Sequence, residues 1–241
     1  MPRRTAYGPG TPCWVDHITV DLTGAKQFYG DLFGWEFTRE NSRGYHLITL
    51  RGEIIGGLGP SPMGPAFGSS WNVYLAAKDL GRTRAEVGRL GGRIVMGPVP
   101  AGENGRLCLA VDPSGAAVGF WEGGRDEGVV LVDEPGALCA CELHTSRQEA
   151  ATEFYRSLYG DAPLVIRPSA RTGWVPFFGA GAGDGAGDGD GASAGASAGD
   201  AAGDGAGDAA VAAALAAGAR PLESGLLADP LGAVFGLTNL N

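Results

Sequence analysis

An internal repeat is the feature that most constrains this chain. The segment TPCWVDHITVDLTGAKQFYGDLFGWEF at 11–37 reappears as LCACELHTSRQEAATEFYRSLYGDAPL at 138–164. Each copy has a short apolar strand with an acidic residue, a polar break, and a helix containing A-x-x-F-Y. Each helix ends in an aromatic residue followed by glycine, which is typical of a helix C-terminus that turns into the left-handed region. The repeat therefore predicts two copies of one β-α unit.

A second repeated motif closes each half of the chain, as VDPSGAAVGFWE at 111–122 and ADPLGAVFGLTN at 228–239. Asp-Pro-x-Gly favours a tight turn, because proline presets φ and glycine accepts a positive φ. Within the first half the strand–helix pattern recurs at 71–79 and 80–92, and three strand-like runs follow each helix. The first half is therefore predicted to be β-α-β-β-β twice.

The second half contains a tract of Gly, Ala, Ser and Asp at 179–210. Such a composition cannot bury enough apolar surface to offset chain entropy, so we expect a disordered loop. Calcium-binding nonapeptide repeats and the G-x-G-x-x-G dinucleotide fingerprint do not fit it. By spacing, the tract stands where the first half has the strand at 71–79. We therefore expect a second half that has lost ordered structure.

These patterns predict an α+β protein with two related domains. The expected divisions are a tail at 1–10, a first domain at 11–124, a linker at 125–136 and a second, degraded domain at 137–241.

Charge and composition narrow the classes of partner. The formal net charge is −9, which disfavours nucleic acid and anionic membrane surfaces because both need a basic patch. No stretch approaches the roughly 18 apolar residues of a membrane span. The first ten residues lack the apolar run of a secretory signal, and the four cysteines include no C-x-x-C pair. Reduced thiols and a cytoplasmic location are the expectation.

The paired β-α-β-β-β units, the F-Y pair and the D-P-x-G turn resemble the vicinal oxygen chelate superfamily. This superfamily includes glyoxalase I, extradiol dioxygenases, fosfomycin-modifying enzymes and bleomycin-binding proteins. The openings P-C-W-V-D and E-L-H-T are similar to those of two-domain, glyoxalase-like actinobacterial proteins. The resemblance covers 11–178 and 209–239. It implies that paired units curl into an open, eight-stranded cup, and that tandem halves replace a homodimer, so a monomer or a homodimer is expected.

The resemblance also implies where a metal would be held. Active members bind a divalent ion through His, Gln or Glu at set strand positions. By register these positions are Trp14, Asn72 and Gly119 in the first half, and Ala140 and Gly236 in the second. None of these is a usual ligand. We therefore expect no metal and no other cofactor.

The histidines are assigned to faces by strand alternation. His17 lies three residues after Trp14, so it is expected to face away from the cup as a packed residue. His144 shares its parity with Ala140 and Glu142 and is expected to point into the second cup. Glu142 and His144 are candidate catalytic groups or two of three metal ligands, and a satisfied polar pair is the alternative.

By the same alternation, the first cup presents aromatic walls, one carboxylate and one amide: Trp14, Asp16, Asn72, Tyr74 and Trp121. The rings and the amide are candidate ligand-binding residues of a pocket for a planar small molecule. The alternative is that the rings simply fill a closed core. Asp16 is the candidate catalytic residue, because a buried carboxylate needs a partner, a ligand or a raised pKa. Glu142 repeats it in the second half.

Three functions follow. The first is a metal-independent protein that binds an aromatic or antibiotic-like molecule, for resistance by sequestration. The second is a natural-product tailoring enzyme of the isomerase, cyclase or lyase type, with Asp16 or Glu142 as the acid–base group. The third is a metal-dependent glyoxalase or dioxygenase with ligands other than those placed above. A vestigial site in a structural protein is a fourth reading.

Overall fold

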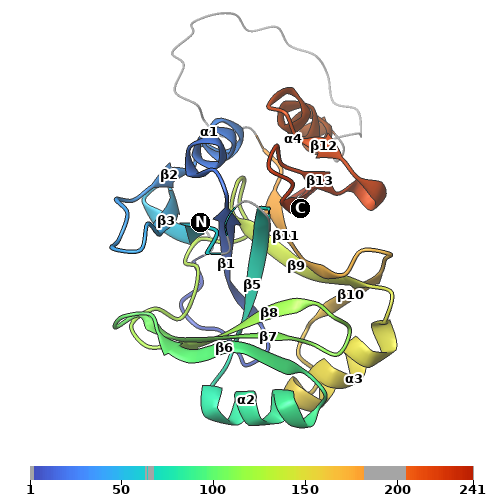
Figure 1. Ribbon diagram of the computed structural model, residues 1–241. Coiled ribbons are helices and arrows are strands. Elements are labelled where there is room, and N and C mark those ends of the chain that lie inside the picture. Colours follow the sequence, from blue (N-terminus) through green and yellow to red (C-terminus); the bar gives the residue numbers. More distant parts are fainter. Residues whose placement is uncertain (1–2, 63, 65–67, 182–204, 241) are drawn as a thin grey trace, which may run out of the picture.

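The structure is a computed structural model that describes residues 3–62, 64, 68–181 and 205–240 (Figure 1). The elements of the first half are β1 (Pro12–Thr19), α1 (Leu22–Phe33), β2 (Glu36–Phe37), β3 (His46–Leu50), β4 (Glu53–Pro60), β5 (Ser70–Ala76), α2 (Leu80–Arg89), β6 (Arg93–Pro100), β7 (Gly105–Val111) and β8 (Ala117–Gly123). Those of the second half are β9 (Leu138–Thr145), α3 (Gln148–Tyr159), β10 (Val165–Pro168), β11 (Gly173–Gly179), α4 (Gly205–Ala216), β12 (Arg220–Pro221), a 3₁₀ turn (Glu223–Gly225), β13 (Leu227–Ala228) and β14 (Val234–Thr238).

The first half forms one eight-stranded sheet in the order β2-β3-β4-β1-β5-β8-β7-β6. Strand β1 runs parallel to β4 and antiparallel to β5, and β5 runs parallel to β8. The sheet is therefore two β-α-β-β-β units joined through their first strands. This confirms the α+β class and the paired units predicted from the repeat.

Local signals set the bounds of the first helix. The side chain of Asp21 accepts a hydrogen bond from the backbone N–H of Gly24 at 3.0 Å, which caps the N-terminus of α1. At the other end Gly34 has φ 69° and ψ 27°, and its N–H donates to the carbonyl of Gly30. The left-handed glycine predicted from the repeat is present.

The second half forms a six-stranded sheet in the order β10-β9-β11-β14-β13-β12. Strand β11 pairs antiparallel with β9 and parallel with β14, as β5 does with β1 and β8. The counterpart of 71–79 is therefore β11, and the prediction that the Gly/Ala/Asp tract replaced this strand is wrong. A loss of ordered structure lies before this strand, because α3 is followed by the single strand β10 where α1 is followed by three strands.

Most of the loop predicted at 179–210 lies outside the described residues, at 182–204. Its two ends are corrected by the structure. Gly179 is the last residue of β11, and helix α4 begins at Gly205. Strands β12 and β13 have two residues each, so ordered structure is reduced here as well. Within the described ranges, no helix is long and apolar enough to cross a membrane.

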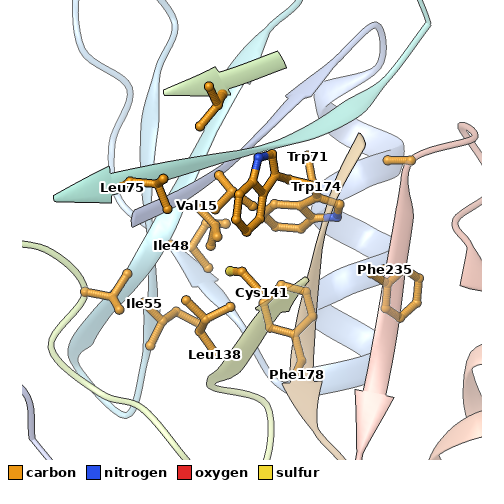
Figure 2. Packing of buried hydrophobic residues seen from close by; sticks show 14 of the residues in the cluster. Val15, Ile48, Ile55, Trp71, Leu75, Leu138, Cys141, Trp174, Phe178 and Phe235 are labelled. Atoms are coloured by element: carbon orange, nitrogen blue, oxygen red, sulfur yellow. The ribbon is translucent and has the colours of Figure 1, made fainter. Parts of the chain in front are cut away.

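The two sheets share one hydrophobic core (Figure 2). Phe235 on β14 is fully buried, and its ring centroid lies 6.2 Å from that of Phe28 and 5.9 Å from that of Tyr29, both on α1. Trp71 on β5 lies 5.3 Å from Phe178 on β11. Helix α1 lies beside α4 at one end, and α2 beside α3 at the other (Figure 1). Each half therefore supplies part of the core that covers the other.

The two repeated motifs bond to each other across the domains. The Tyr29 hydroxyl of the first F-Y pair donates to Oδ2 of Asp229 in the second D-P-x-G turn, at 3.0 Å. In the opposite direction, the Tyr155 hydroxyl donates to Oδ2 of Asp112 at 2.9 Å. In both aspartates Oδ1 accepts backbone N–H groups of its own turn. Each of these two carboxylates thus stabilises its own turn and also accepts a hydrogen bond from the other domain.

His17 lies on the interdomain side of β1, as strand alternation predicts. Its side chain is fully buried, and its Nε2 lies 3.0 Å from Oδ2 of Asp229. The ring packs against Trp71 and Tyr29 at centroid distances of 5.0 and 5.3 Å. His17 is therefore a packed, hydrogen-bonded residue of the domain interface.

Candidate functional site

The concave face of the first sheet is organised around a buried carboxylate. Asp16 on β1 is 5% exposed and lies opposite Asn72 on β5. Nδ2 of Asn72 donates to Oδ1 of Asp16 at 2.8 Å, and the hydroxyl of Tyr74 donates to Oδ2 at 3.0 Å. A third donor is the hydroxyl of Tyr45, 3.4 Å from Oδ2. All three donors are neutral groups.

These surroundings change the acidity of the cluster. Burial raises the pKa of Asp16 from its ordinary value near 3.8 to about 6, against the lowering effect of hydrogen bonds from Asn72, Tyr74 and Tyr45. Burial, followed by the nearby charge of Asp16, raises the pKa of Tyr45 and Tyr74 well above the ordinary range. Asp16 therefore has a pKa suited to exchanging a proton near neutral pH, while both tyrosines remain protonated donors.

Two tryptophans extend this face. Trp14 and Trp121 are partly exposed and stack with a centroid distance of 6.4 Å and an interplanar angle of 19°. Nε1 of Trp14 donates to the hydroxyl of Tyr45 at 3.3 Å. Five predicted residues thus lie on one face of the sheet: Trp14, Asp16, Asn72, Tyr74 and Trp121. Their assignment to a ligand site remains a proposal.

Tyr45 is the residue that sequence reasoning missed. It precedes β3, and its ring covers Gly57 and Gly59 on β4, where a Cβ atom would clash with it. These alternate glycines on the concave side of a strand were the signal, because they leave room for a ring from a neighbouring strand. Its position became clear only from the pairing of β3 with β4.

A cavity of about 260 Å³ opens at the end of this face, beside Trp121. Tyr7, Ala76, Lys78 and Glu127 also line it. Its volume is slightly below the range of about 300–1,000 Å³ that is usual for small-molecule sites. The partly exposed rings of Trp14 and Trp121 would allow a flat molecule to extend from this cavity along the face.

The metal positions implied by the superfamily do not fit a divalent ion. The ring of Tyr74 occupies the space beside Gly119, and the ring of Phe177 occupies the space beside Gly236. The amide of Asn72 is engaged as a donor to Asp16. In the described part of the chain, no three His, Cys, Asp or Glu side chains are grouped to hold a metal. Aromatic rings thus take the place of the donors that a metal would need.

A methyl group at Gly119 tests this packing. We expect Gly119→Ala to lower the free energy of unfolding by about 1–3 kcal/mol, because the new Cβ would overlap the Tyr74 ring. The matched control is Gly88→Ala in α2, where a Cβ meets nothing within 4 Å and alanine should add up to about 1 kcal/mol. Urea denaturation measures both. A Gly119→Ala protein as stable as the parent would contradict this arrangement.

The candidate pair in the second domain has a different environment. Glu142 on β9 is held by the Arg167 side chain, whose Nη2 lies 3.0 Å from Oε1. Nε2 of His144 lies 3.3 Å from Oε2 of Glu142 but outside hydrogen-bond geometry, so it has no hydrogen-bond partner. Glu142 is thus paired with a cation, whereas Asp16 has only neutral donors. A catalytic role for Glu142 and His144 remains a prediction.

Comparison with known proteins finds similarity to one family. Residues 14–120 match the Glyoxalase/Bleomycin resistance protein/Dioxygenase superfamily. The chain is 39% identical over 166 residues to "Putative glyoxylase CFP32" of Mycobacterium tuberculosis. It is 30% identical over 175 residues to "Anthracycline biosynthesis protein DnrV" of Streptomyces peucetius. Each match covers 66% of this chain and 64% of the relative, slightly under two thirds of the relative's length.

Solved structures share the fold. The Mn(II)-bound glyoxalase from Novosphingobium aromaticivorans matches with a TM-score of 0.60 and 14% identity, covering 97% of this chain and 83% of that one. The 2,3-dioxygenase LapB from Pseudomonas sp. KL28 matches with a TM-score of 0.60 and 11% identity, covering 97% and 93%. At this identity the likeness concerns the fold alone. The chain is therefore similar to the Glyoxalase/Bleomycin resistance protein/Dioxygenase superfamily over residues 14–120, and it shares the fold of these solved structures over nearly its whole length.

Proposed function

We propose that this protein binds a planar, hydroxylated aromatic molecule on the concave face of its first domain, without a divalent metal. The observation that carries the proposal is the buried carboxylate of Asp16, which is bonded only to neutral donors and lies on the same face of the sheet as two partly exposed tryptophans. The rings of Trp14 and Trp121 offer flat apolar surfaces. Asn72 and Tyr45 are partly exposed residues, and their polar groups would meet hydroxyl groups of the ligand.

One comparison supports the choice of ligand class. DnrV is named for anthracycline biosynthesis, and anthracyclines are planar, hydroxylated polycycles. Binding without chemistry would sequester such a molecule. The aromatic walls and the absence of metal donors at Trp14 and Gly119 support this function over a metal-dependent glyoxalase or dioxygenase.

Binding is tested with 1,8-dihydroxyanthraquinone as the probe. We expect it to quench the fluorescence of the parent protein in excess EDTA, with no change when Mn²⁺ replaces EDTA. Trp14→Leu should weaken binding by about 1–3 kcal/mol, roughly 5- to 150-fold, because an aromatic stacking surface is lost. Val95→Ala, at an exposed position on β6, is the control. Binding that requires Mn²⁺, or that survives Trp14→Leu unchanged, would contradict the proposal.

A second candidate function is favoured by the pKa of Asp16 near 6. A carboxylate with this acidity beside two tyrosine hydroxyls is suited to act as a general base toward an acidic C–H or O–H group of the bound molecule. In such a tailoring enzyme, Asp16→Asn would abolish turnover and retain binding. In a sequestering protein the same variant would have no turnover to lose. Product analysis after incubation with hydroxylated polycyclic aromatics separates the two.

A further inference from the structure

A cluster of four side chains lies directly behind the Asp16 site. Strands β1 and β5 pair so that Asp16 lies opposite Asn72, and the next pair is His17 opposite Trp71. Because side chains alternate, the first pair faces the cup and the second faces the other domain. Two adjacent residue pairs of strands β1 and β5 thus lie back to back: Asp16 and Asn72 in the candidate site, and His17 and Trp71 at the domain interface.

Asp229 of the second domain joins both residues of the rear pair. Its Oδ2 lies 3.0 Å from Nε2 of His17 and accepts the Tyr29 hydroxyl at 3.0 Å. The Tyr29 oxygen in turn accepts Nε1–H of Trp71 at 2.9 Å. These groups are fully buried or nearly so. One carboxylate from the second domain therefore holds the two strands whose front faces present Asp16 and Asn72.

The second domain contains a built-in comparison. Asp112 receives Tyr155 at 2.9 Å, and Tyr155 receives Nε1–H of Trp174 at 3.2 Å. The repeat places Leu143 where the first domain has His17, so the link from the aspartate to the neighbouring strand is missing. In front of this copy, Glu142 lies opposite Val175, which has no side-chain donor. The same interdomain bond thus exists once with a carboxylate–amide pair on the other side of the strands, in the first domain, and once without such a pair, in the second.

We infer that Asp229, acting through Tyr29 and His17, is a positioning residue for the Asp16–Asn72 pair, so that the second domain is part of the first domain's site. This inference rests on the proposed function of that site. A positioning role for Asp229 would explain why the second domain keeps its Asp-Pro-x-Gly turn, although only one strand follows its first helix.

The charged and titratable groups around the two carboxylates define the test. Asp229 faces His17 and Tyr29, and Asp16 faces Tyr45 and Tyr74. Burial alone would raise the pKa of Asp229, but the hydrogen bond and charge of His17 hold it below its ordinary value. A variant that keeps every charge is therefore preferable, and Tyr29→Phe removes only a hydroxyl.

The experiment is a carboxyl ¹³C NMR titration of Asp16 in the full chain without ligand, comparing Tyr29→Phe with Tyr155→Phe. Both variants lose one interdomain hydrogen bond of the same kind. If Asp229 positions Asp16, Tyr29→Phe should weaken the bond from Asn72 and raise the pKa of Asp16 by about half a unit or more, since a donor to the charged form is lost. Tyr155→Phe should leave it unchanged.

Equal shifts in both variants, or no shift in either, would overturn the inference. A fall confined to Tyr29→Phe would mean that water reaches the carboxylate, and would also overturn positioning through Asn72. If Tyr29→Phe does not fold, Asp229→Asn is compared with Asp112→Asn instead. Removing the negative charge of Asp229 would by itself lower the pKa of Asp16, so a rise in that pKa would still indicate lost positioning. No ligand is used, so failure of dihydroxyanthraquinone binding and failure of this coupling are separate results.

Discussion

Replacing Phe235 with alanine is expected to lower the free energy of unfolding by about 3–5 kcal/mol, the largest loss for any substitution considered in this protein. The ring is fully buried on β14 of the second domain. It lies 6.2 and 6.4 Å from the rings of Phe28 and Phe33 on α1 of the first domain, and 6.4 Å from that of Phe178. Its removal would leave a cavity in the core that both domains share.

Urea denaturation followed by far-UV circular dichroism measures this effect. Because one hydrophobic cluster spans both sheets, we expect a single transition that moves to lower urea as a whole. The control is Leu215→Ala, at an exposed position of α4, which should change stability by no more than about 0.5 kcal/mol. A loss below about 1 kcal/mol, or two separate transitions in the parent protein, would contradict a shared core.

Asp16→Asn is expected to stabilise the protein by about 3 kcal/mol at neutral pH and to have little effect near pH 4. In the folded protein, burial raises the pKa of Asp16 from near 3.8 to about 6. The folded state therefore holds this proton more tightly than the unfolded state. The contribution of Asp16 to stability falls as the pH rises from about 4 to about 6 and stays constant above that range.

Asparagine cannot ionise, so the variant lacks the part of the pH dependence of stability that comes from Asp16. The hydroxyls of Tyr74 and Tyr45 can accept as well as donate, which leaves the new amide with partners. Unfolding of parent and variant is measured near pH 4 and near pH 7.5, and the difference between them isolates Asp16. Asp31→Asn, at an exposed position of α1, is the control. A variant that is less stable at neutral pH, or a difference independent of pH, would contradict the prediction.

The environment of the Asp16 carboxylate bears on function. A buried carboxylate that has a raised pKa and receives only neutral donors is typical of a functional site rather than of a stabilising ion pair. Glu142 occupies the corresponding place in the second domain and is neutralised by Arg167. The two halves share a scaffold but differ in the chemistry of the central acid. We therefore propose the first domain, rather than the second, as the location of the ligand site.

Much of the candidate site was predictable from the sequence because strand alternation is a local property. Once 12–19 and 70–76 are read as strands, Trp14 must share a face with Asp16, and Asn72 with Tyr74. The register of the two strands then puts both pairs on one face. The same alternation turned His17 to the opposite side. The repeated motifs, together with the strand–helix pattern at 71–92 and the strand-like runs after each helix, likewise predicted paired β-α-β-β-β units.

The remaining features were decided by tertiary structure, because they depend on which segments meet. Tyr45 reaches Asp16 only because β3 and β4 pair in the register that puts its ring over Gly57 and Gly59. The sequence predicted that the second half has lost ordered structure, but only strand pairing located a loss before β11. The bonds of His17 and Tyr29 to Asp229 join residues about 200 positions apart in the chain. Alternation along a strand is set by neighbouring residues, whereas the partner of a buried polar group is set by how distant surfaces pack.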